Sequence, residues 1–306
     1  MGATVRPVPP FDLALSCAVF SGGDPGIRRY DGRRFTMVLR LGKGLALATV
    51  TAGGTARRPL LSVGLRSRSP PGRARRSEAG DAIGSFFNAR MDPGPFLRQV
   101  RHDRPMAALA ERLAGLRAPT TPTVFESLVD SIIEQQISLK VAWVLEERLV
   151  KGFGDRLDIP GGPYFIYPEP GQIASAPPER LRALGLSNRK AECIIGLGRD
   201  CARGELDLER LRRLPCEEII SVLCGRRGIG RWTAELTMLR GMGRFDALPA
   251  DDLGVRRAIC LYYRKRRPPT AGEARKIAER WGDWKGLAAF YLLTAERMGI
   301  PPGRKD

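Results

Sequence analysis

The first third of the chain alternates apolar and polar residues with a period of two. Four short runs show this alternation: residues 11–19, 35–41, 45–49 and 61–65. Such runs predict strands that bury one face, and Gly42-Lys43-Gly44 predicts a turn between two of them. We therefore expect an antiparallel sheet of four or five strands. The basic, Pro/Gly/Ser-rich residues 66–81 are expected to form a solvated loop.

From about residue 82 the period changes to 3.6, which is typical of helices. Three helix starts carry capping residues: Thr123 with Glu126, Ser187, and Thr270 with Glu273. Residues 285–297 are nearly all apolar and predict a buried helix. The fold class expected is α+β, with an N-terminal antiparallel sheet domain (about 1–90) followed by an all-α core (91–306).

The net charge of the chain indicates what kind of partner it binds. Lys and Arg number 51 against 33 acidic residues, a net charge of +18. An excess of this size favours a polyanionic partner, most simply nucleic acid, although a general basic bias would give it too. The chain has no apolar run of about 18 residues and does not open with a cleavable signal pattern. We expect a soluble, intracellular, DNA-associated protein of the cytoplasm or nucleoid, without a membrane partner.

The sequence offers few residues for a metal site or for a nucleophilic catalytic pair. None of the six cysteines forms a C-x-x-C pair, and His102 is the single histidine. Scattered thiols in a reducing compartment are the simplest interpretation. One histidine in a linker-like stretch argues against a zinc site and against a Ser-His or Cys-His pair.

Residues 216–242 predict two short helices joined by Gly228-Ile229-Gly230. Glycines free the backbone to turn tightly and let a phosphate approach. The unpaired N–H groups at the start of the second helix can hold that phosphate without reading the base sequence. The same turn could also be a simple helix connector. The flanking arginines and the net charge favour phosphate binding.

Two adjacent aspartates, Asp251 and Asp252, follow this unit after a proline-containing loop. An aspartate before residues 253–257 is what a helix N-terminus prefers. A carboxylate near DNA phosphates could instead stabilise positive charge that develops on a sugar during glycosidic cleavage. Spacing alone leaves both interpretations open.

Several stretches together resemble the helix-hairpin-helix DNA glycosylase superfamily. They are GIGRWTA (228–234), the loop GMGRFDALPA (241–250) with Asp251 after it, SIIEQQIS (131–138), ERWGDW (279–284) and FDLALS (11–16). The last two resemble the alkylation-repair branch, 3-methyladenine DNA glycosylase II. The likeness covers nearly the whole chain and is most specific over residues 120–300.

The resemblance implies a role for individual residues. Asp251 falls at the catalytic aspartate, and Gly228, Ile229 and Gly230 fall at the hairpin that binds the DNA backbone. Gln136 falls at the wedge that fills the space of a flipped base, although it could be a helix-surface glutamine. Trp232 could stack on that base or pack beneath the hairpin. Arg189 and Lys190 are expected to be solvated or to face phosphate.

The implied activity is hydrolysis of the N-glycosidic bond of alkylated bases in double-stranded DNA, by a monomer. No redox or nucleotide cofactor and no side-chain metal ligand is expected. The resemblance suggests one structural Na⁺ or K⁺ held by hairpin carbonyls.

Three departures from relatives refine this expectation. Trp232 stands where bifunctional members carry a nucleophilic lysine. Only Cys260 lies where iron–sulfur members carry four cysteines, so no cluster is expected. Leu236 and Leu293 stand where the bacterial enzyme has pocket aromatics. A bifunctional 8-oxoguanine-type glycosylase/lyase and a non-catalytic helix-hairpin-helix DNA-binding protein are the alternatives.

Overall fold

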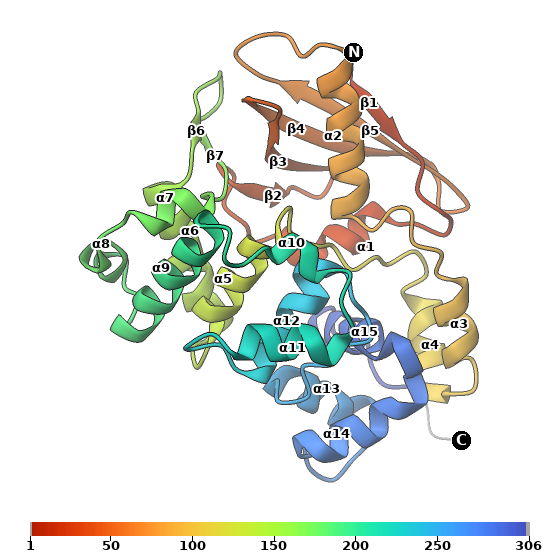
Figure 1. Ribbon diagram of the computed structural model, residues 1–306. Helices are drawn as coiled ribbons and strands as arrows, with labels where there is room; N and C mark the ends of the chain where they lie inside the picture. Colours follow the sequence, from red (N-terminus) through yellow and green to blue (C-terminus); the bar gives the residue numbers. More distant parts are fainter. Residues whose placement is uncertain (1, 304–306) are drawn as a thin grey trace.

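The computed structural model describes residues 2–303. Its N-terminal part holds a five-stranded antiparallel sheet in the order β1-β5-β4-β3-β2 (Figure 1). The strands are β1 (Ala3–Val5), β2 (Arg28–Tyr30), β3 (Arg34–Leu41), β4 (Gly44–Thr55) and β5 (Arg58–Arg66). Val50 faces Phe35 on one side and Val63 on the other, and all three are fully buried. The predicted strands at 35–41, 45–49 and 61–65 are confirmed.

The predicted strand at 11–19 is wrong, because this segment is helical. Asp12 accepts a hydrogen bond from the Leu15 amide at 2.9 Å and caps α1 (Leu13–Cys17), which continues into η1 (Ala18–Phe20). Leu13 and Cys17 are four residues apart, so a helix buries both on one face as readily as a strand would. The N-cap hydrogen bond decides between the two.

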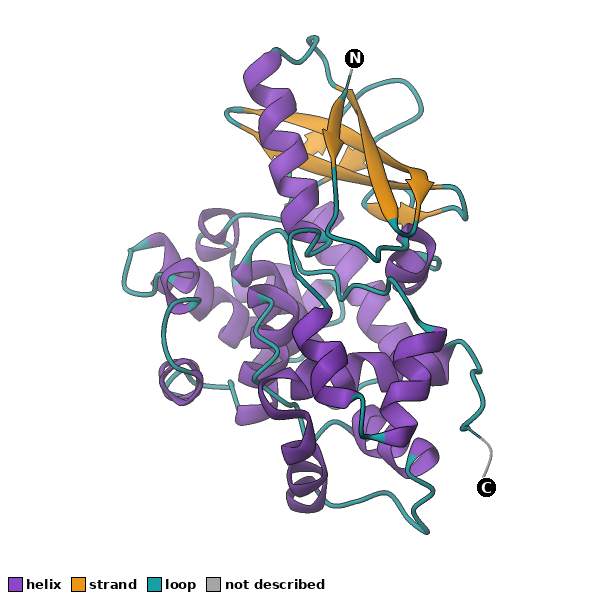
Figure 2. Ribbon diagram, turned by 90° about the vertical axis from the view of Figure 1, so that its right-hand side faces the viewer, coloured by secondary structure: helices purple, strands orange, loops and turns teal. Residues whose placement is uncertain are grey.

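The predicted loop at 66–81 is wrong in its second half. Helix α2 (Arg73–Phe86) begins inside it and lies across the sheet (Figures 1 and 2). Its buried residues Ala79, Ile83 and Phe86 lie at helical spacing and pack on the sheet. The first two turns carry arginines and bury little, so they show no apolar period that would reveal the helix.

The remaining chain is almost entirely helical (Figure 2). Its helices are α3 (Gly94–Val100), α4 (Arg104–Arg112), α5 (Val124–Glu134), α6 (Leu139–Phe153), α7 (Pro170–Ala174), α8 (Pro178–Ala183), α9 (Asn188–Ala202), α10 (Leu208–Leu211), α11 (Cys216–Cys224), α12 (Arg231–Met242), α13 (Leu253–Tyr262), α14 (Ala271–Ala278), η2 (Glu279–Trp284) and α15 (Lys285–Arg297). A two-stranded ribbon, β6 (Arg156–Leu157) with β7 (Tyr164–Phe165), interrupts them. The α+β prediction is confirmed. No helix among the described residues is long and apolar enough to cross a bilayer.

The predicted caps form at the helix starts. The Ser187 hydroxyl accepts from the Lys190 amide at 3.4 Å, and Thr270 and Glu273 form a reciprocal capping box. Thr123 accepts from the Glu126 amide at 3.1 Å. The Glu126 carboxylate, however, pairs with an arginine of the sheet domain, as described below.

Helix α12 lies between the two apolar cores of the helical part. Ala234 and Met238 pack into a cluster with α5, α6, α9 and α11, whereas Leu239 joins a second cluster around α13 and α15. Gly241 permits this placement, because a Cβ there would lie 2.7 Å from the Cβ of Ser127 on α5. The second half of α12 is thereby held at the junction of both clusters.

Candidate functional site

The hairpin between α11 and α12 requires glycine at one position for two reasons. Gly228 has a φ of +90°, and a Cβ on it would lie 2.9 Å from the sulfur of Cys193. Gly230 has an ordinary φ of −103°, and a Cβ there would meet nothing within 4 Å. Between them Ile229 is buried and anchors the turn in the core.

The start of α12 is open to an anion. Gly230 is the N-cap residue of α12 and has no side chain to act as a cap. The first amides of the helix therefore lack a side-chain hydrogen-bond acceptor. A depression of about 330 Å³ lies beside the hairpin. Its lining includes Arg189, Arg226 and Arg227, together with Asp200 and Glu192, which pair with Arg226 and Arg227. Open N–H groups, the positive helix end and nearby guanidinium groups suit a phosphate.

Asp252, rather than Asp251, lies at the centre of the candidate site. Asp252 is the N-cap of α13: its Oδ1 accepts from the Val255 amide at 2.9 Å, and its Oδ2 accepts from Trp232 Nε1 at 3.2 Å. The Asp251 side chain is 57% exposed, and its Oδ2 lies 3.6 Å from a guanidinium nitrogen of Arg275.

Of the two aspartates it is therefore Asp252, and not Asp251 with its predicted catalytic role, whose carboxylate contacts Trp232 after the hairpin. The turn that precedes α13 closes with the Asp252 amide donating to the Pro249 carbonyl at 3.0 Å. Adjacent side chains leave this turn in different directions. Counting residues along the sequence could not distinguish them.

Trp232 lies in the first turn of α12 and is half-buried. Its indole N–H is committed to Asp252. The side chain therefore joins the hairpin to the aspartate, which favours its predicted place at the site over simple packing beneath the hairpin.

Gln136 occupies the turn between α5 and α6, not a helix surface. It is exposed and has a φ of +58°, in the left-handed region that non-glycine residues seldom adopt. Its neighbour Gln135 ties this turn to the hairpin: Gln135 Nε2 donates to the Gly228 carbonyl and to Thr233 Oγ1, both at 3.0 Å. The turn that carries the predicted wedge is thus fastened directly to the predicted phosphate-binding loop.

Lys190 is neither solvated nor directed at phosphate, in contrast to the prediction. Its Nζ donates to the carbonyls of Ile133 at 2.8 Å and Gln135 at 2.7 Å, and so satisfies the C-terminal end of α5. Burial lowers the pKa of Lys190. The lysine holds the same turn from the side of α9.

The sequence patterns considered above did not reveal a row of acidic residues on α5. Glu126, Asp130 and Glu134 are spaced by four residues and share one helix face. Glu126 Oε1 accepts from Arg28 Nη2 of β2 at 2.6 Å, and Glu134 Oε1 accepts from Arg240 Nη1 of α12 at 2.6 Å. The spacing E-x3-D-x3-E inside an apolar helix was the available signal.

Arg240 connects this row to the aspartate. Burial lowers the pKa of Arg240, but the carboxylates of Glu134, Asp252 and Asp130 raise it on balance. The pKa of Arg297 on α15 is lowered by burial and by the charge of Arg240. Arg240 thus interacts electrostatically with Glu134, Asp252 and Arg297.

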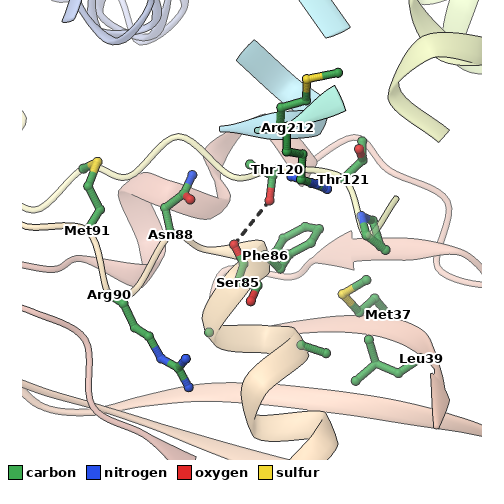
Figure 3. A pocket seen from close by; sticks show the side chains of 14 residues that line it. Met37, Leu39, Ser85, Phe86, Asn88, Arg90, Met91, Thr120, Thr121 and Arg212 are labelled. Atoms are coloured by element: carbon green, nitrogen blue, oxygen red, sulfur yellow. Dashed lines mark hydrogen bonds between the residues drawn. The ribbon is translucent and has the colours of Figure 1, made fainter. Parts of the chain in front are cut away.

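A larger cavity lies elsewhere, between the sheet domain and the helical core (Figure 3). It has a volume of about 520 Å³, and its lining includes Met37, Phe86, Asn88 and Arg212. It contains no residue of the hairpin or of the Gln136 turn, and neither aspartate. None of the residues expected to act in the reaction therefore lines this cavity.

Comparison with known proteins places this geometry in a family. A model described as HhH-GPD superfamily base excision DNA repair protein matches residues 129–283, which include the hairpin, the Gln136 turn and both aspartates. The chain belongs to the HhH-GPD superfamily. The resemblance stated from the sequence motifs is thereby confirmed.

Within the HhH-GPD superfamily the chain is similar to proteins named for 3-methyladenine. It is 32% identical to DNA-3-methyladenine glycosylase of Bacillus subtilis over 228 residues, 74% of this chain and 75% of that protein. The structure of 3-methyladenine DNA glycosylase from Archaeoglobus fulgidus superposes with a TM-score of 0.84 at 28% identity, covering 97% of this chain and 99% of that one. A Schizosaccharomyces pombe 3-methyladenine DNA glycosylase, solved in complex with abasic DNA, gives a TM-score of 0.55 at 27% identity, covering 62% and 90%.

Proposed function

We propose that this protein is a monofunctional DNA glycosylase of base excision repair. It hydrolyses the N-glycosidic bond of alkylated bases of the 3-methyladenine type in double-stranded DNA. The observation that carries the proposal is the carboxylate of Asp252, oriented by Trp232 beside an open hairpin. The relatives named for 3-methyladenine support the choice of substrate.

The reaction begins with removal of the base from the stack. Gln136, exposed on its fastened turn, enters the space that the base leaves, and Trp232 lies where it can contact the flipped nucleotide. The Asp252 carboxylate stabilises the positive charge that develops on the sugar as the glycosidic bond breaks. Because N3- and N7-alkylated purines are cationic, they are good leaving groups, and modest activation by one carboxylate separates them from normal bases.

Backbone contacts hold the duplex. The N–H groups at the start of α12 and the basic residues Arg189 and Arg227 hold phosphates of either damaged or undamaged DNA. The net charge of +18 adds long-range attraction. We propose that the protein acts as a monomer in the cytoplasm or nucleoid, where this charge brings it to DNA.

Strand cleavage is not part of the proposal. A lyase step needs an amine that attacks the sugar, and Trp232 offers none. The amine of Lys190, the lysine that reaches the wedge turn, donates to two backbone carbonyls. These contacts favour a monofunctional enzyme over the 8-oxoguanine-type glycosylase/lyase.

We also propose a structural Na⁺ or K⁺ at the hairpin, held by backbone carbonyls. Two hairpin carbonyls accept hydrogen bonds, Gly228 from Gln135 Nε2 and Arg226 from the Ile229 amide, and each keeps a second lone pair. Neutral oxygens of this kind suit a weakly coordinating cation. The cation would neutralise phosphate charge and takes no part in bond cleavage. No iron–sulfur cluster is proposed, since Cys260 has no neighbouring cysteine in the sequence.

Release of free bases from methylated duplex DNA tests the proposal. The wild-type protein is expected to release 3-methyladenine and to leave strands intact until alkali is added. Retained DNA binding without any base release would instead support the non-catalytic DNA-binding alternative, which has no need of Asp252.

A further inference from the structure

The sheet domain carries more than half of the net charge of the chain but no residue of the candidate site. Residues 1–90 hold 15 Lys and Arg against 5 Asp and Glu, so they account for +10 of the net charge of +18. The sheet lies at one end of the molecule, whereas the hairpin and both aspartates belong to the helical part (Figure 2). This excess indicates that a polyanion contacts the sheet domain itself.

The strands of the sheet are rich in arginine and contain no acidic residue. β1 to β5 together hold six arginines and neither aspartate nor glutamate. One face of the sheet packs on α2 through Phe35, Val50 and Val63. We call the opposite face the outer face. Because side chains alternate along a strand, Arg29, Arg34 and Arg58 point to the outer face.

Strand pairing places two rows of side chains on the outer face, with hydroxyls in the middle and an arginine at one end. Residues that pair directly across neighbouring strands point to the same face. The first row is Thr4, Ser62, Thr51 and Arg34, and the second is Gly64, Thr49, Thr36 and Arg29. Every residue of the first row is exposed, and so is Arg29. Arg58 is exposed too, and it extends the outer face along β5.

Most polar groups of these rows are available to a ligand. Within residues 2–303 the hydroxyls of Thr51 and Ser62 make no hydrogen bond, and the guanidinium groups of Arg29 and Arg58 have no carboxylate partner. Arg34 pairs with Asp31 at 2.9 Å, and its side chain is still 61% exposed.

The other end of the outer face is already covered and provides a contrast. Val38 and Leu47 are buried together with Leu157 of β6. Arg40, also on β3, pairs with Asp155 at 2.8 Å. The arginine at the covered end thus has a partner within the protein, whereas Arg29 and Arg58 at the uncovered end have none.

We propose that the two rows and Arg58 bind the sugar–phosphate backbone of duplex DNA, at a place separate from the hairpin. Arginine side chains and serine or threonine hydroxyls contact phosphate oxygens, and no carboxylate on the strands repels them. The rows contain no aromatic side chain on which an unpaired base could stack, and no large apolar side chain that could anchor a protein partner. Contacts of this kind do not read sequence, so the outer face holds damaged and undamaged DNA alike.

Affinity for an undamaged duplex at several salt concentrations tests the proposal. A triple variant, Arg29→Gln with Arg34→Gln and Arg58→Gln, is compared with the wild type. The slope of log affinity against log salt is expected to become shallower by about 2 to 3, because each lost phosphate contact removes about 0.9.

The matched control removes the same charge from the other side of the sheet. Arg73→Gln with Arg75→Gln and Arg76→Gln alters α2, and it is expected to change the salt slope by less than about 1. A third variant keeps the charge. Thr51→Val with Ser62→Ala is expected to weaken binding by about 3-fold or more, because two phosphate hydrogen bonds are lost.

An equal change of slope in both triple variants would assign the effect to overall charge and overturn the proposal, and so would unchanged binding in the outer-face variants. Thermal unfolding shows whether each variant is folded. Single-turnover base release at saturating DNA is expected to stay within about 2-fold of the wild type, because the outer face holds only backbone. If the wild type releases no base, the glycosylase proposal fails, whereas the comparison of duplex affinities still decides this one.

Discussion

Trp232 donates its indole N–H to Asp252 across 3.2 Å, and this contact joins the start of α12 to the start of α13. The second carboxylate oxygen of Asp252 is held by the Val255 amide at 2.9 Å. With one oxygen bound to each helix start, the carboxylate has a defined orientation beside the hairpin. Neighbouring Asp251 has neither contact and faces Arg275.

Asp252→Asn is expected to abolish base release, with a fall of at least about 100-fold, because the charge that stabilises the sugar cation is removed. Asparagine is as good an N-cap as aspartate, so α13 and the thermal stability should be preserved. Binding to damaged duplex should persist or tighten. Asp251→Asn is the matched control and should retain activity. Loss of activity in Asp251→Asn alone would return the catalytic role to that residue.

Gly228→Ala is expected to cost about 1–3 kcal/mol of stability, since alanine must adopt a φ of +90° and its Cβ meets Cys193. Gly230→Ala meets no atom and should cost less, which provides the comparison. Thermal unfolding measures the difference. Duplex affinity should fall for Gly228→Ala alike on damaged and undamaged DNA, because phosphate contacts carry no sequence information. For the wild type, affinity should fall steeply with salt; a flat dependence would contradict the basic DNA-binding surface.

Borohydride added during turnover is expected to trap no covalent protein–DNA product. A Schiff base needs a free amine at the sugar, and the position after Arg231 is tryptophan. Abasic products should remain uncleaved until alkali is added. The measurement is gel analysis of labelled duplex with and without alkali. A strong trapped product that disappears on mutating one lysine, such as Lys190, would show the bifunctional alternative to be correct.

Asp130 is expected to make stability depend on pH. Burial and the nearby Glu146 and Glu126 carboxylates raise its pKa well above the ordinary value, although Tyr167 donates to it at 2.8 Å. Above about pH 4 the unfolded chain loses the Asp130 proton while the folded protein keeps it, so rising pH lowers the free energy of unfolding.

The Asp130→Asn variant lacks that titration. Its stability relative to wild type should therefore rise from about pH 4 upward and level off above the folded pKa. Urea unfolding of both proteins at several pH values measures this difference. A constant difference across the range would mean that folding leaves the pKa of Asp130 unchanged.

The sequence by itself determined the features that depend on neighbouring residues. The hydroxyls of Ser187 and Thr270 predicted helix starts, because an N-cap bond closes over three residues. The hairpin at Gly228 followed from the freedom of glycine to turn, and strands β3, β4 and β5 followed from strict alternation. The family followed from motifs whose spacing is local.

Only the tertiary structure decided the features that depend on contacts between residues far apart in the sequence. The segment that begins with Asp12 alternates like a strand but forms a helix, because its cap hydrogen bond and its packing agree on one helical face. Which of the two aspartates contacts Trp232 depended on how the turn before α13 directs their side chains, since Trp232 lies about twenty positions earlier. Glu134 and Arg240 are 106 positions apart and meet because α5 packs on α12. The periodicity of a helix indicates which residues are buried, but not which charged residue lies opposite them. For Glu134 that residue is Arg240, and only the fold brings the two together.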